Sequence, residues 1–119
     1  MAKKPEYNYK SLQTEYGKMP PQAVDLEEAI LGSLMLEKDA FITVSDFLKP
    51  ECFYKEAHQK IYRGIQNLSL NNEPVDILTV SEEMKRLGEL EDIGGYYYLA
   101  QLTSKVASAA HIEFHARIV

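Results

Sequence analysis

The chain has 119 residues, of which 45% are hydrophobic, so it is long enough for one compact core and too short for two ordinary domains. Its formal charge is −5, from 13 Lys and Arg residues against 18 Asp and Glu residues, and such a surface repels phosphate. Composition therefore argues against non-specific binding to nucleic acid as the main task. Residues 1–19 hold four lysines and two glutamates and carry +2, which leaves −7 for residues 20–119.

Cysteine content and hydropathy set further limits. Cys52 is the only cysteine, which excludes an internal disulfide and a metal site built from cysteines within one chain. No apolar run approaches the ~20 residues that a membrane-spanning helix needs, and the N-terminus lacks the apolar core of a secretory signal. We therefore expect a cytoplasmic protein with no membrane contact, in which Cys52 is a small core residue.

The chain divides at a pair of prolines. Residues 1–19 show no helical or alternating apolar period, which predicts a flexible basic arm. Pro20 and Pro21 follow, and consecutive prolines cannot lie inside a helix, so the globular part is expected to begin there and to cover residues 20–106. Residues 107–119 are expected to begin a further helical segment.

The first helix is predicted over residues 26–36. Asp25 followed by Glu28 resembles a capping box at its start. Gly32 weakens a helix by roughly 1 kcal/mol relative to alanine, so its presence indicates a close helix crossing. The expected buried stripe comprises Leu26, Ala29, Ile30 and Leu34.

A short helix and a long central helix come next. Residues 40–48 combine a β-branched run, which suits a strand, with a good N-cap in Asp39, and we predict a short helix. Pro50 starts a short turn through Tyr54. Residues 55–68 form the predicted central helix, because apolar side chains recur along it at Ala57, Ile61, Ile65 and Leu68.

The last third of the chain is predicted to hold three helices. Asp76 caps a segment whose apolar face carries Ile77, Val80, Met84 and Leu87, and Gly88 ends it. A further short helix follows Gly94 and Gly95, and Ser108 caps a final segment that lacks a stop signal, as if the sequence continued. The fold class is therefore all-α, a compact orthogonal domain of about six helices that ends in the start of a truncated helical hairpin.

Catalytic motifs are not found in the sequence. There is no Gly-rich loop ending in Gly-Lys-Ser or Gly-Lys-Thr, and no Gly-x-Gly-x-x-Gly. His111 and His115 have the i, i+4 spacing of metal ligands, but a zinc site needs a third protein ligand, so surface or interface histidines are the preferred interpretation. Neighbouring carboxylates, such as Glu27 and Glu28, are interpreted as solvated faces. We expect no catalytic residue, no metal ligand and no cofactor in this chain.

Three consecutive tyrosines are the remaining candidate for binding. Tyr96, Tyr97 and Tyr98 could stack on bases, but a stacking surface needs basic neighbours, and here the preceding residues are acidic. Packing in the core for some and exposure for others is the preferred interpretation. Exposed tyrosines would then be candidates for contact with another protein.

Several segments, in order, resemble the N-terminal domain of bacterial replicative DNA helicases of the DnaB type. The first runs from Pro20 to Met35 (PPQAVDLEEAILGSLM), and the later ones include Phe53-Tyr54, 74–80 (PVDILTV), 93–95 (IGG) and 108–110 (SAA). The resemblance covers about residues 20–119. Leu26 stands where the family usually has a small residue, and His111 and His115 stand where Asn and Tyr are commoner.

The resemblance implies a collar domain of a ring-shaped hexameric helicase. In that family, ATP hydrolysis with Mg²⁺ and movement along DNA belong to a separate C-terminal domain, whereas the N-terminal domains pair with one another through a helical hairpin and dock primase. Asp76 and Tyr98 lie in family motifs associated with collar packing and primase coupling. They, with His111 and His115, are the candidate partner-binding residues.

Two other functions are compatible with the residues. One is a module for binding single-stranded DNA through the basic arm and the tyrosines. The other is a metal-dependent hydrolase built around His111 and His115.

Overall fold

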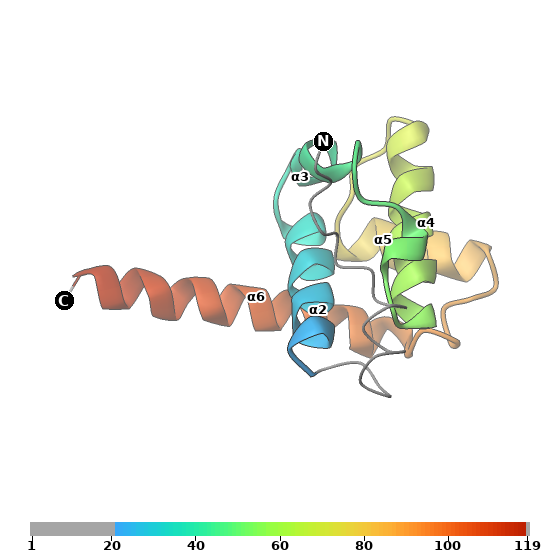
Figure 1. Cartoon of the computed structure of the whole chain (residues 1–119). Coiled ribbons are helices and arrows are strands. Elements are labelled where there is room, and N and C mark those ends of the chain that lie inside the picture. Colours follow the sequence, from blue (N-terminus) through green and yellow to red (C-terminus); the bar gives the residue numbers. More distant parts are fainter. Residues whose placement is uncertain (1–20, 119) are drawn as a thin grey trace, which may run out of the picture.

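The computed structural model describes the backbone of residues 21–118 and the side-chain environment of residues 23–108. Within this range the chain is all-α, with five α-helices, one 3-10 turn and no strand, as the sequence predicts. The elements are α2 (Pro21–Leu36), α3 (Ala40–Val44), the 3-10 turn η1 (Pro50–Cys52), α4 (Glu56–Leu70), α5 (Ile77–Arg86) and α6 (Gly95–Ile118) (Figure 1). None of these helices is long and apolar enough to cross a membrane. The predicted arm lies outside the described residues.

The core forms around α4, which confirms the predicted central helix. Its apolar stripe repeats every three or four residues and is buried at Ile61, Ile65 and Leu68, with Tyr62 beside it. The Tyr62 hydroxyl donates a hydrogen bond to the Leu48 carbonyl (2.7 Å), and burial raises the pKa of Tyr62 to about 12. The full set of buried apolar residues is Leu31, Leu34, Met35, Phe53, Ile61, Tyr62, Ile65, Leu68, Val80, Met84, Ile93, Leu99 and Leu102.

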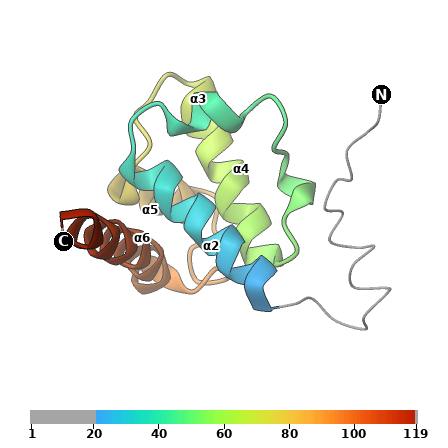
Figure 2. The same cartoon turned by 60° about the vertical axis from the view of Figure 1, so that its left-hand side comes forward.

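The prediction for α2 was wrong in its start and in two of the four side chains of its buried face. The helix begins at Pro21, where a proline is tolerated because the first amides of a helix have no internal partner, so Asp25 lies inside the helix and does not cap it. Leu26 is 53% exposed and Ala29 is exposed as well. Leu34 is buried and Ile30 packs partly buried against the core, as predicted. The other buried side chains are Glu27, Leu31 and Met35, because α2 lies between α4 and α6 and must face both (Figure 2).

Gly32 marks a close helix crossing, as predicted. A Cβ atom at this position would lie 2.4 Å from the Leu102 carbonyl oxygen and 2.7 Å from Val106 Cγ2, so α6 approaches the backbone of α2 directly. Glycine is the residue that permits this approach. The crossing fixes the middle of α6 against the last two turns of α2.

We expect Gly32→Ala to destabilise the domain by about 1–3 kcal/mol, because the added methyl group meets a backbone carbonyl that cannot turn aside. Helix propensity alone would give the opposite sign, a gain of about 1 kcal/mol. Gly64→Ala is the matched control, since its Cβ would meet side-chain atoms and no backbone, with Met84 Sδ at 2.8 Å and Glu83 Cγ at 3.7 Å. Urea unfolding measures the free energy of unfolding of both variants and of the parent. A Gly32→Ala protein as stable as the parent would contradict the close crossing.

The boundaries of α5 are those that the sequence predicts. Asp76 Oδ1 accepts a hydrogen bond from the Thr79 amide (2.9 Å), and the Asp76 amide donates to Thr79 Oγ1 (2.9 Å), so the two residues cap the helix reciprocally. Gly88 has a φ of 73° just beyond the helix, the left-handed conformation expected of a C-terminal stop. Val80 and Met84 are buried, whereas Leu87 is 38% exposed.

The prediction of two helices after Gly95 was wrong. A single helix, α6, runs from Gly95 to Ile118, and Ser108 lies inside it. Residues 103–107 contain neither glycine nor proline, so nothing in the sequence interrupts the helix there. Figure 1 shows the C-terminal half of α6 running outward from the body of the domain.

Two smaller predictions also needed correction. Asp39 occupies the N-cap position of α3, as predicted, but its φ is 69° and its side chain makes no capping hydrogen bond. Cys52 is only partly buried, at the end of η1, and lies outside the group of core residues.

Candidate interaction site

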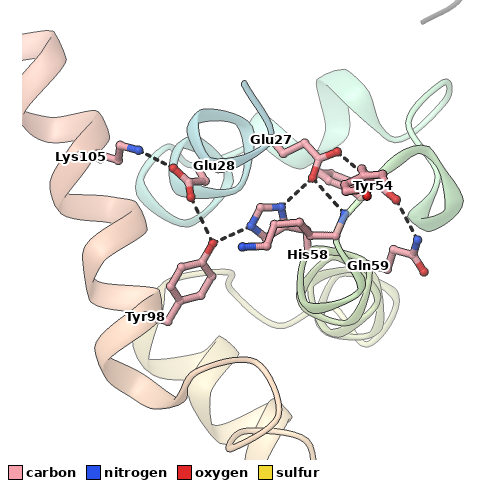
Figure 3. Close-up of polar contacts among 9 residues, drawn as sticks. Glu27, Glu28, Tyr54, His58, Gln59, Tyr98 and Lys105 are labelled. Atoms are coloured by element: carbon pink, nitrogen blue, oxygen red, sulfur yellow. Dashed lines mark hydrogen bonds and ion pairs between the residues drawn. The ribbon is translucent and has the colours of Figure 1, made fainter. Parts of the chain in front are cut away.

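A polar network crosses the apolar core and joins α2, α4 and α6 (Figure 3). Its centre is Glu27, which has no exposed surface. Its carboxylate accepts hydrogen bonds from the Tyr54 amide (2.6 Å) and the Lys55 amide (3.5 Å), and it lies 2.7 Å from His58 Nδ1. Both amides precede α4, which has no side-chain cap of its own. Glu27 therefore provides the acceptor for the two amides that lead into the helix.

His58 carries the network from α2 and α4 to α6. Its ring is fully buried, and its Nε2 lies 2.6 Å from the Tyr98 hydroxyl. Because a carboxylate only accepts hydrogen bonds, Nδ1 carries the proton that it shares with Glu27. The ring of Tyr98 stacks on His58 at a centroid distance of 5.9 Å, and Lys55 Nζ lies 5.8 Å from the same ring.

Glu28 closes the network at the surface. One of its carboxylate oxygens accepts from Lys105 of α6, and the other lies 3.4 Å from the Tyr98 hydroxyl. Lys105 Nζ also lies 3.6 Å from Asp25. Burial alone would raise the pKa of Glu28, but the hydrogen bond and charge of Lys105, with smaller contributions from His58 and Tyr98, hold it below its ordinary value of 4.5. Burial and then the Glu28 charge raise the pKa of Tyr98.

We expect Glu27→Leu to cost about 3–5 kcal/mol of stability, because it removes the acceptor that the buried imidazole of His58 and a partly buried backbone amide share. Glu27→Gln keeps one acceptor oxygen and should cost less. Glu82→Leu, on an exposed position of α5, is the matched control and should lie within about 0.5 kcal/mol of the parent. Chemical unfolding monitored by circular dichroism measures all three, and equal losses for positions 27 and 82 would refute the structural role of Glu27.

Acid titration tests the outer part of the network. The pKa of Glu28 is lower in the folded protein than its ordinary value, so its stabilising contribution is present above about pH 4.5 and is lost as the pH falls through the folded pKa. The parent should therefore exceed Glu28→Gln in stability by a constant amount near neutral pH, and this difference should shrink below about pH 4.5. A difference that does not change with pH would contradict the ion pair.

The structure places the predicted partner-binding residues in different regions. Asp76 caps α5 and lines a groove near the C-terminal end of α2, whereas Tyr98 lies in the network beside Glu28. His111 and His115 belong to α6, but their side chains lie outside the described part of the chain. Among residues whose side chains are described, no group of three or more His, Cys, Asp or Glu residues is arranged to hold a metal ion.

The sequence interpretation missed Glu27 and His58. The interpretation of neighbouring carboxylates as solvated was wrong for Glu27, which is fully buried, and also for Glu83, which is only 8% exposed. A signal for Glu27 was present, because it precedes Leu31 and Leu34 by four and seven residues, the spacing of one helix face.

Comparison with known proteins identifies the fold. The family described as DnaB-like helicase N terminal domain matches residues 19–119. The chain belongs to this family. The crystal structure of the N-terminal domain of DnaB helicase from Mycobacterium tuberculosis superposes with a TM-score of 0.66 and 42% sequence identity, covering 72% of this chain and 60% of that one.

Full-length members of the DnaB family are much longer than this chain. Replicative DNA helicase DnaB of Rhodothermus marinus is 49% identical over 109 residues, which are 92% of this chain and 12% of that protein. Replicative DNA helicase DnaB of Geobacillus stearothermophilus is 42% identical over 102 residues, 86% of this chain and 22% of that protein. The chain thus spans about an eighth to a fifth of these curated relatives.

Proposed function

We propose that this chain is the non-catalytic N-terminal collar domain of a hexameric replicative DNA helicase, and that it mediates subunit assembly and primase coupling in the cytoplasm. The observation that carries the proposal is the match to the DnaB-like N-terminal family over residues 19–119, together with relatives that are replicative DNA helicases. ATP hydrolysis with Mg²⁺ and unwinding are assigned to a separate C-terminal domain. The proposed partners are primase and other copies of this chain, and contact with DNA is assigned to the separate C-terminal domain.

The shape and charge of the domain support an assembly role. α6 runs outward from a body that the Glu27 network holds rigid at its base, so a pairing element on α6 would project at a fixed angle (Figure 1). We assign residues 107–119 to the first part of such a pairing hairpin. The net charge of −5 favours protein partners over the phosphate backbone of DNA.

Mixing the chain with the cognate primase tests the coupling role. We expect complex formation by isothermal titration calorimetry, and a weakening of about tenfold, or about 1.4 kcal/mol, for Asp76→Asn if its charge contacts primase. Asparagine caps helices as well as aspartate does, so this variant removes the charge and keeps the cap of α5. Asp46→Asn, on an exposed residue of the same charge, is the control.

Two results would overturn the proposal. One is ATP turnover by the purified chain, which would refute the non-catalytic assignment. The other is the absence of a complex with primase together with a monomeric mass at all concentrations, which would remove both proposed roles.

Loss of primase binding in Tyr98→Phe, with unfolding otherwise unchanged, would separate a partner contact of the hydroxyl from its hydrogen bond to His58.

A single-stranded DNA-binding module is the second candidate, and one observation favours it. Tyr96 and Tyr97 are 50% and 73% exposed on adjacent positions of α6, where bases could stack on them. Binding of an oligonucleotide that weakens steeply with salt, and that is lost on deleting residues 1–19, would favour this function over the collar role.

A further inference from the structure

A groove of about 590 Å³ lies where α2 and α4 both end. α3 forms one side, and the segment that leads from α4 to the start of α5 forms the other. The residues that line it are Leu34, Met35, Leu36, Glu37, Lys38, Asp39, Phe41, Ile42, Ser69, Asn72, Glu73, Pro74, Val75 and Asp76. The groove is remote from the Glu27 network, which contacts the first half of α2.

Apolar walls and an acidic rim define the chemistry of this groove. Leu36 and Ile42 are 49% and 67% exposed, which is unusual for side chains of this size. Among the residues that line the groove, four carry a carboxylate and one, Lys38, carries a positive charge. Of these carboxylates, Asp76 is engaged in capping α5, whereas Glu37, Asp39 and Glu73 form no ion pair with any described residue.

The two helix ends add to the negative potential. A helix carries about half a negative charge at its C-terminus, which is normally offset by basic residues in the last turn. Neither α2, with 16 residues, nor α4, with 15 residues, has a basic residue in its last turn. An occupant of this groove must therefore bring positive charge as well as apolar surface.

We propose that the groove binds residues 1–19 of its own chain. This segment carries +2 against −7 for the rest of the protein, and it holds four lysines together with three tyrosines, at positions 7, 9 and 16. Lysine side chains would meet the acidic rim, and tyrosine rings would cover the exposed leucine and isoleucine. The proposal does not rest on the helicase function.

The length of the segment allows it to reach the groove. It joins α2 at Pro21, and the 16 residues of α2 rise about 24 Å from that point to the groove. Nineteen residues can extend up to about 63 Å, so the segment can return along α2 and still place several residues in the groove.

Paramagnetic relaxation of the full chain tests the proposal. Cys52→Ser removes the native thiol, and Ser11→Cys carries a nitroxide label in the middle of the arm. We expect the amide signals of residues 37–39, 72, 73, 75 and 76 to lose most of their intensity, and to regain it in 1 M salt, where screening acts within about 3 Å. Glu37→Lys with Glu73→Lys should abolish the loss.

The matched control is Glu51→Lys with Glu91→Lys, which changes the net charge equally at exposed positions outside the groove. It should leave the intensity loss intact. Equal broadening of amides over the whole domain, or a loss that survives the groove variant, would overturn the proposal. A loss seen only when labelled and isotope-enriched molecules are mixed would also overturn it, because the segment would then come from a neighbouring copy.

Discussion

The buried carboxylate of Glu27 is the interaction on which the arrangement of the helices depends. A charge without exposed surface is costly unless donors surround it, and here two backbone amides and one imidazole do so. These donors come from the start of α4 and from its first turn. The position of α2 on α4 is therefore fixed by a directional contact as well as by apolar packing, which alone tolerates rotation.

The same contact extends to α6 through His58. Tyr98 and Lys105 are seven residues apart on α6, which places them on one face, and both reach Glu28 of α2. Gly32 lets α6 approach the α2 backbone at Leu102, between these two residues, and at Val106. Three successive turns of α6 are thus attached to α2, so the direction in which its outer half leaves the domain is determined by the core (Figure 1).

Local signals in the sequence were sufficient for most of the fold. The stripe of α4, the Asp76 cap of α5 and its stop at Gly88 each depend on residues within one or two turns of one another, and all three were predicted correctly. The face of α2 was predicted only in part, because Leu26 was preferred to Glu27, for which the spacing from Leu31 and Leu34 was the one local signal. Hydrophobicity assigns Leu26 to the core, whereas the amides at the start of α4, 27 and 28 residues away, make Glu27 the better choice.

The exposure of Leu26 and the burial of Glu27 also explain how α2 contributes to two separate regions of the domain. With Glu27 facing inward, the first half of α2 holds the helices together, and its last turn is left free to border the acidic groove with Leu36. The two regions share a helix but no side-chain contact that would link their ionic groups. A segment that enters or leaves the groove would therefore change the charge and apolar surface at one end of the domain while α6 kept its direction at the other. Such a separation would let the proposed collar domain bind a partner at one end without a change in the direction of α6.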